Sequence, residues 1–188
     1  MSTPLITYLN SIYPLSPALK EKLQSIIKTK QVAKKTILLK QGQMSDCIYY
    51  IETGFIRSYY EKEGRQITAW FMADNDFIIS VESFFKRTNS NENIEVLQNS
   101  VLHYIEYEEL ELLYKDFLEF NVVGRVLTTH YYILSEERLY NMRRQSAVER
   151  YNFLLKKYPD VLLKASLTQI ASYLGVTLET LSRVRGKK

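Results

Sequence analysis

The chain has 188 residues, enough for one large domain or two small ones, with 46% hydrophobic residues and a formal net charge of +4. Its single cysteine, Cys47, excludes an intrachain disulfide and an iron–sulfur cluster held by four thiolates of one chain. No apolar run reaches membrane-spanning length, and residues 1–9 lack a signal-peptide pattern, so we expect a cytoplasmic protein without membrane contact.

Residues 17–27 have the apolar spacing of a short amphipathic helix. From residue 31 to residue 107, short β-rich runs alternate with turn residues such as Gly, Asp and Asn. We expect strands at 36–39, 48–51, 55–61, 67–72, 94–97 and 101–107. Evenly spaced short strands of this kind predict an antiparallel barrel or jelly roll.

Residues 110–141 have a helical pattern, with a long uninterrupted helix from about Phe120. Two neighbouring apolar stripes follow this helix: Phe120, Val123, Leu127 and Leu134 on one, and Val122, Val126, Ile133 and Tyr140 on the other. Together they are wider than one flat contact needs, so we expect one stripe to pack on the roll and the other on a second helix. A helix buried within a monomer is the alternative. Gly124 costs helix stability and would permit close approach of a neighbouring element.

The apolar pattern breaks at residues 143–146 and then restarts in a helix at 147–158, which Pro159 ends. We place a domain boundary at this break. It separates a sensor domain, residues 1–142, from a DNA-binding domain, residues 143–188.

The segment from Ser166 onward has the local signals of a helix-turn-helix. Ser166 and Gln169 form a capping box, in which each side chain bonds the other residue's backbone. Gly175 stands where the first helix must end, and Thr177 stands at the N-cap of the second. A helical hairpin with a solvated charged face is the alternative interpretation.

Charge is distributed unevenly along the chain. Residues 143–188 contain ten Lys and Arg against three Asp and Glu, a net of +7, whereas residues 1–142 have a net of −3. A basic end on a mildly acidic body is typical of a nucleic-acid-binding domain joined to another domain. Glu179 and Arg183 share one face of the last helix, where Glu can accept from cytosine and Arg can bind guanine.

The order of small helix, β-roll, long helix, hinge and helix-turn-helix resembles the cyclic-AMP receptor protein and Fnr superfamily of bacterial transcription regulators. The resemblance rests on Gly42, the Ile-Glu-Thr-Gly run at 51–54, Gly64, Phe77 and the whole segment 167–183. It implies an α+β fold: an N-terminal antiparallel β-roll (jelly roll) of the cyclic-nucleotide-binding type, a long dimerisation helix at about 110–142, and a C-terminal helix-turn-helix. It also implies a homodimer and a recognition helix in the major groove.

In the family pattern an acidic residue and an Arg four positions apart read bases, which maps onto Glu179 and Arg183. The family's frequent basic residue before the Glu is Leu178 here. The linker 159–166 is too short for the usual β-hairpin wing and the chain stops at Lys188, so we expect no full wing. The predicted DNA-binding residues are Thr168, Thr177, Glu179, Thr180, Arg183, Arg185, Lys187 and Lys188, the last three on phosphates.

In cyclic-nucleotide binders of this family, a Gly-Glu-Leu-like start and an Arg-Ser or Arg-Ala pair hold the ribose and phosphate. The equivalent stretch here, 77–96, lacks the glycine and has Glu92-Asn93 in place of the pair. A carboxylate repels a phosphate, so we expect the roll to sense a molecule other than cyclic AMP, or nothing. The candidate pocket residues are Glu82, Arg87, Glu92 and Asn93, with a solvated-loop role for Glu82 and Arg87 as the alternative.

We therefore predict a DNA-binding transcriptional regulator, with double-stranded DNA, a second copy of the chain, an unidentified small-molecule effector and RNA polymerase as partners. The alternative is a small-molecule-binding regulatory module whose DNA-binding tail is vestigial. A cupin-type enzyme would need a cluster of His and carboxylate ligands on the roll. Only His103 lies there and His130 lies in the helix, so we expect no metal, no cofactor and no catalytic residue.

Overall fold

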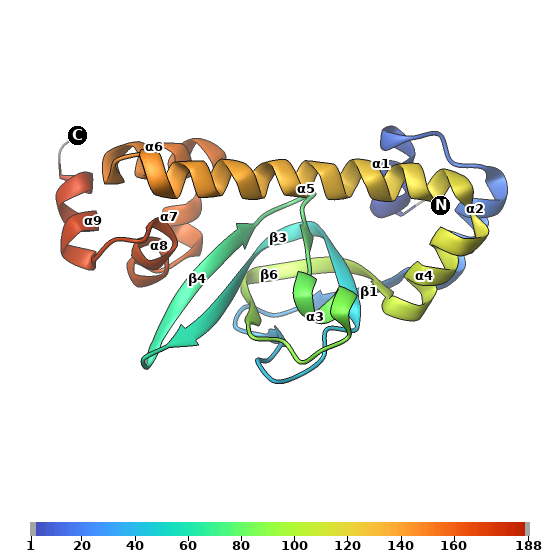
Figure 1. Cartoon of the computed structure of the whole chain (residues 1–188), viewed down its shortest axis with the longest axis horizontal. Helices are drawn as coiled ribbons and strands as arrows, with labels where there is room; N and C mark the ends of the chain where they lie inside the picture. The colour runs from blue at the N-terminus through green and yellow to red at the C-terminus, as the bar shows by residue number, and fades with distance from the viewer. Residues whose placement is uncertain (1–2, 187–188) are drawn as a thin grey trace.

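The computed structural model describes residues 3–186. One long helix, α5, runs along the molecule, with the sheet beneath its middle (Figure 1). Helices α1, α2 and α4 lie at one end of α5, and helices α6 to α9 lie at the other. The helices are α1 (Pro4–Ile12), α2 (Pro17–Ile26), α3 (Val81–Lys86), α4 (Tyr107–Asp116), α5 (Leu118–Arg144), α6 (Ala147–Lys157), α7 (Val161–Lys164), α8 (Leu167–Leu174) and α9 (Leu178–Arg185).

The strands form one antiparallel six-stranded sheet in the order β1-β6-β3-β4, with β2 paired to β6 and β5 paired to β3. They are β1 (Lys28–Val32), β2 (Ile37–Leu39), β3 (Cys47–Lys62), β4 (Arg65–Met72), β5 (Phe77–Ile78) and β6 (Asn93–Glu106). The predicted α+β class is confirmed: an antiparallel β domain, a long helix and a helical C-terminal region.

Two details of the predicted strands are wrong. The expected strands 48–51 and 55–61 are one strand, β3, and 94–97 and 101–107 are joined in β6. Gly54, which lies between the two expected strands, forms a bulge in β3, with φ of 143° and register shifts on both sides. A Cβ at this position would collide with the Ser100 side chain on β6, so glycine is required where the two strands approach.

The predicted helix 17–27 is confirmed as α2, and the long uninterrupted helix expected from about Phe120 is confirmed as α5; Phe117 separates it from α4. The Asn121 amide caps the end of α4 by donating to the Tyr114 carbonyl at 2.7 Å. Gly124 does permit a close approach: a Cβ there would lie 2.5 Å from the Tyr114 ring. Helices α1 and α3 have no counterpart in the sequence-based prediction.

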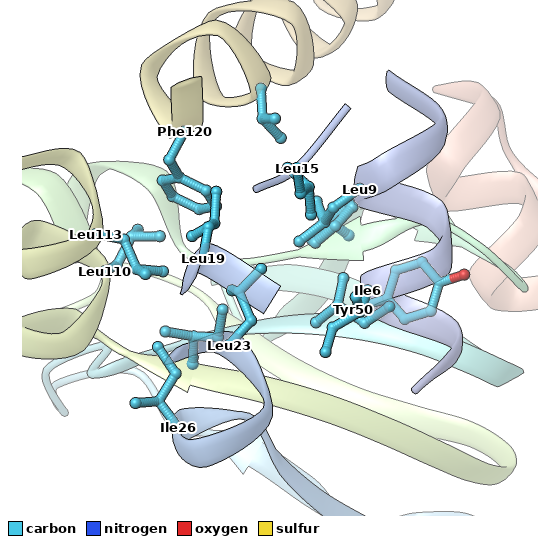
Figure 2. Close-up of a cluster of buried hydrophobic side chains, with 14 of the residues drawn as sticks. Ile6, Leu9, Leu15, Leu19, Leu23, Ile26, Tyr50, Leu110, Leu113 and Phe120 are labelled. Atoms are coloured by element: carbon cyan, nitrogen blue, oxygen red, sulfur yellow. The ribbon is translucent and has the colours of Figure 1, made fainter. Parts of the chain in front are cut away.

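Buried side chains form three clusters. The first joins α1, α2, α4 and the start of α5 to the sheet, with Leu19, Leu23 and Leu113 fully buried (Figure 2). The second connects the roll to the C-terminal helices, and the third lies within the roll. Within the described residues, no helix has the length and apolar character needed to cross a bilayer.

Candidate DNA-binding helices and effector cavity

Helices α8 and α9 form a helix-turn-helix whose caps match the predicted positions. Ser166 N–H donates to Gln169 Oε1 at 2.8 Å, and Gln169 N–H donates to Ser166 Oγ at 3.2 Å. Gly175 ends α8 in the left-handed region, with φ of 65°. Thr177 Oγ1 accepts from Thr180 N–H at 3.2 Å and begins α9. Four nearby residues, Ser166, Gln169, Gly175 and Thr177, therefore determine where α8 begins and ends and where α9 begins.

The helix-turn-helix is held by a closed core that it shares with α6, α7 and the sheet. Ile170 and Leu174 of α8 and Leu181 of α9 are buried against Leu154 of α6 and Val161 of α7. These contacts fix the angle between α8 and α9, so the exposed face of α9 is held rigidly. A fixed recognition helix is what binding in a groove of the double helix requires.

The structure places most of the predicted DNA-binding side chains on the surface. Thr168, Thr177, Glu179, Arg183 and Arg185 are exposed, and Thr180 is half-buried; Lys187 and Lys188 lie outside the described residues. Arg183 Nη2 donates to Thr180 Oγ1 at 3.1 Å, one turn earlier on α9. Among residues 3–186, no ion pair joins Glu179 to Arg183, so both charged groups face solvent.

Glu179 lies in the first turn of α9 and is fully exposed. The Thr177 side chain, the N–H groups of the helix start and, more weakly, Arg183 lower the pKa of its carboxyl. Glu179 is therefore ionised at neutral pH, as a hydrogen-bond acceptor for a base amino group must be.

The helix-turn-helix docks on the edge of the sheet, and sequence reasoning missed this contact. Ser172 Oγ of α8 accepts from the N–H of Thr68 on β4 at 2.9 Å and donates to the Gln66 carbonyl at 3.1 Å. The Tyr158 hydroxyl donates to the Phe71 carbonyl at 2.6 Å. These partners are 87 to 106 residues apart in the sequence, so no local pattern indicates them.

Arg138, near the end of α5, joins the long helix to the contact between α8 and β4. Its guanidinium donates to the Tyr173 carbonyl at 3.1 Å and lies 3.9 Å from the centre of the Tyr173 ring. Tyr173 in turn packs on Phe71 of β4, with ring centres 4.9 Å apart. The sheet, α5 and α8 therefore meet at Tyr173.

A cavity of about 510 Å³ lies between the sheet and α5. Apolar side chains from both sides form most of its wall, including Met72 and Ile78 from the sheet and Leu127 from α5. Leu5 and Leu9 of α1 close one end. Two glutamates, Glu82 and Glu92, line the cavity, and among residues 3–186 no Lys, Arg or His lines it.

Glu92 and Ser58 are the polar groups at the sheet side of this cavity. Burial raises the pKa of the Glu92 carboxyl, and the nearby Ser58 and Ser80 hydroxyls offset only part of that effect. Within the described residues, no basic side chain pairs with Glu92. Ser58 is 3% exposed, and its Oγ makes no hydrogen bond of normal geometry to any described residue. A buried hydroxyl without a partner is rare in folded proteins.

The structure brings together only two of the four predicted pocket residues. Glu82 lies on α3 at the rim of the cavity, where it pairs with Lys86 at 2.9 Å, and Glu92 lies inside. Arg87 does not line the cavity, because it pairs with Asp46, donates to the Ser45 carbonyl and stacks on the Tyr107 ring. The buried Asn93 accepts from the Gln41 N–H at 3.0 Å, also outside the cavity.

The two predicted stripes of α5 differ in exposure. Phe120 and Val123 are buried and Leu127 and Leu134 are half-buried, whereas on the second stripe only Val122 is half-buried. The rest of the second stripe faces solvent in the single chain: Val126 is 37% exposed, Ile133 59% and Tyr140 54%.

Residues 29–117 match the family model of the cyclic nucleotide-binding domain. No curated protein matches the chain. A Crp/Fnr-family transcriptional regulator structure from Eubacterium rectale is 22% identical, with a TM-score of 0.74 over 97% of this chain and 85% of that chain.

Two further structures are similar. FixK2 from Bradyrhizobium japonicum is 20% identical, with a TM-score of 0.71 over 86% of this chain and 84% of that chain. A CooA variant from Carboxydothermus hydrogenoformans is 20% identical, with a TM-score of 0.67 over 100% of this chain and 84% of that chain. The roll is thus a cyclic nucleotide-binding-type domain. The chain as a whole has the fold of the Crp/Fnr regulators, and the resemblance predicted from the sequence is confirmed.

Proposed function

We propose that this chain is a homodimeric, non-enzymatic transcriptional regulator that binds double-stranded DNA through α9 and responds to an effector other than cyclic AMP in its roll. The observation that carries the proposal is the exposed face of α9, where Glu179 and Arg183 project from a helix-turn-helix with a closed core. The net charge of +7 over residues 143–188 supports attraction to the phosphate backbone. We retain the division into residues 1–142 and 143–188 as part of the proposal.

In this proposal the base-reading residues are Arg183 and Glu179, with Arg183 on guanine and Glu179 on a cytosine amino group. Arg185, Lys187 and Lys188 would bind phosphates and set the salt dependence of binding. The docking of α8 on β4 through Ser172 leaves the α9 face uncovered, which is consistent with DNA access. RNA polymerase as a further partner rests on the resemblance alone.

The cavity supports an effector other than cyclic AMP. Recognition of a cyclic phosphate calls for a cationic group, since charge-assisted bonds from Arg supply most of the contact. The cavity wall has two glutamates and no basic side chain, and Arg87 is held elsewhere by Asp46. A phosphate placed beside the Glu92 carboxylate would be repelled.

The homodimer would form through the exposed stripe of α5. A two-fold axis beside this stripe would place Val126, Ile133 and Tyr140 of two copies against each other, which removes the apolar surface from water. Replacement of Ile133 with Asp should convert the dimer to monomers, measured as a halved mass by light scattering at tens of micromolar. Glu61→Lys, a charge change at an exposed residue of β3 and not on α5, serves as the control and should leave the mass unchanged. Monomeric wild-type protein at that concentration would contradict the dimer.

The DNA-binding proposal is tested by two variants on two duplexes. One duplex is selected by the wild-type protein from a random pool and the other is a scrambled sequence of the same composition. Arg183→Ala should cost about 1–3 kcal/mol on the selected duplex only, whereas Arg185→Ala should weaken both duplexes alike and reduce the salt slope.

Equal weakening of both duplexes by Arg183→Ala would make Arg183 a phosphate contact and overturn the base-reading assignment. If the wild-type protein selects no sequence from the random pool and does not bind the scrambled duplex, the DNA-binding proposal fails. The chain would then be a small-molecule-binding module whose cavity is its working part.

A further inference from the structure

The cavity is long as well as apolar. Its α5 wall extends from Phe120 to Ser135, a length of about 22 Å at the helical rise of 1.5 Å per residue. At one end it reaches Leu5 and Leu9 of α1. Its volume of about 510 Å³ is within the ordinary range of small-molecule sites. An elongated molecule fits this shape better than a compact one.

The polar groups in the cavity are arranged for a hydrogen-bond donor. Within residues 3–186, Ser58 Oγ makes no hydrogen bond of normal geometry, and the Glu92 carboxylate has the nearby Ser58 and Ser80 hydroxyls but no basic side chain beside it. Both groups line the same cavity. Burial of such groups without a partner costs free energy, which a ligand donor would recover.

We propose that the effector is an elongated, mostly apolar amine whose ammonium group binds Glu92 and Ser58 while its apolar part fills the cavity along α5. This inference rests on the proposed function, because it names the effector class of the proposed sensor. An ammonium group has three N–H donors, enough to reach both the carboxylate and the hydroxyl. A purely apolar molecule would leave the Glu92 carboxylate with the nearby hydroxyls alone and no cation, and a carboxylate or phosphate would be repelled by Glu92.

The chain has its own probe for this site. Trp70 is the only tryptophan, and it lines the cavity from β4. Its emission should therefore change when a ligand enters, and isothermal titration can measure the same event independently. We would titrate the full-length protein with octylamine, octanol, octanoate and cyclic AMP, each below its aggregation concentration.

Octylamine should bind most tightly, octanol more weakly and octanoate most weakly, with no response to cyclic AMP. Glu92→Gln should weaken octylamine about tenfold or more while leaving octanol nearly unchanged, since only the amine loses a charge-assisted bond. Glu106→Gln is the matched control, because that carboxylate pairs with Lys28 and does not line the cavity. It should retain the wild-type order of affinities.

Several results would overturn the inference: equal affinity for the three octyl compounds, tighter binding of octanoate, or no binding of any of them. An equal loss in Glu92→Gln and Glu106→Gln would also overturn it. Thermal unfolding of each variant checks that it is folded. Selection of a DNA sequence by a protein that binds no amine would refute the effector class alone, whereas amine binding without DNA binding would refute the regulator proposal alone.

Discussion

The C-terminal helical region and the β-roll use their apolar residues in opposite ways. In the C-terminal helices, Leu154, Ile170 and Leu181 close a core with at most 1% of each residue exposed. Between the roll and α5, apolar side chains such as Met72 of β4 and Leu127 of α5 instead face a cavity of about 510 Å³. Atoms beside a void lack dispersion contacts, so the roll gives up stability that the helical region retains. The roll keeps closed clusters of its own elsewhere, so the loss is local to the space between the sheet and α5, where the proposed sensor would admit a ligand.

Strand β4 belongs to both regions. Trp70 and Met72 line the cavity, while Phe71 between them packs against Tyr173 of α8. Successive side chains of a strand point to opposite faces, so one strand can contact a ligand on one side and α8 on the other. A change in the cavity thus has a direct physical connection to the helix-turn-helix.

The largest expected effect is a difference in the free energy of unfolding between a substitution in the closed helical core and one in the wall of the cavity. Leu174→Ala removes a side chain that is 2% exposed, and it should lower the free energy of unfolding by about 2–5 kcal/mol. The matched change Leu127→Ala removes a half-buried side chain that faces the cavity, and it should cost under about 1 kcal/mol. Urea unfolding followed by circular dichroism measures both. Equal losses would indicate that the cavity is filled in solution and that the two regions do not differ.

The next effect concerns the contact that joins the two regions. Tyr158→Phe removes the hydroxyl that donates to the Phe71 carbonyl, and it should cost about 1–3 kcal/mol because the carbonyl loses its buried partner. Tyr151→Phe is the control: Tyr151 is equally part of the helical core, but its hydroxyl has no hydrogen bond within residues 3–186. It should change stability by about 0.5 kcal/mol or less. Urea midpoints that shift alike for both variants would show that the Tyr158 bond does not hold the regions together.

The same contrast explains how far the sequence could predict the molecule. The helix-turn-helix was predictable because its signals are local: a capping box at Ser166, a left-handed glycine at Gly175 and an N-cap at Thr177. The roll depends on pairing between distant strands. Glycine occurs both in turns and in bulges, so the sequence does not show which of the two Gly54 forms. Only the close approach of Gly54 to Ser100 on β6 shows that it is a bulge.

The sites follow the same rule. The exposure of Arg183 follows from helix periodicity, but the Ser172 bond to Thr68 joins residues 104 apart and has no sequence signal. The cavity is a space left by side chains of many elements, so no motif encodes it. Of the predicted pocket set, Glu92 lies in the cavity, while Arg87 is diverted by Asp46, a residue 41 positions away.

The smallest expected effect is on the pH dependence of stability, to which Glu92 in the roll and Glu149 in the helical region contribute with opposite sign. Burial raises the pKa of Glu92 in the roll, whereas hydrogen bonds from Ser146 lower the pKa of Glu149 in the capping box of α6. Between the ordinary value of 4.5 and its raised value, Glu92 binds a proton more tightly in the folded protein than in the unfolded one. Its ionisation therefore destabilises the fold as pH rises through that window.

Glu149 behaves in the reverse manner, because its folded pKa lies below 4.5, and its contribution to stability is lost as pH falls through the lowered value. Glu92→Gln should therefore stabilise the protein at pH 7.5, and Glu149→Gln should destabilise it slightly. The benefit of Glu92→Gln should fade as pH falls to 4.5, while the loss in Glu149→Gln should persist there and fade only at lower pH. Urea midpoints of both variants and the wild type across this range measure the two differences. If Glu92→Gln is destabilising at pH 7.5, the carboxylate has a partner in the folded protein, and the contrast between an unsatisfied cavity and a satisfied helical region does not hold.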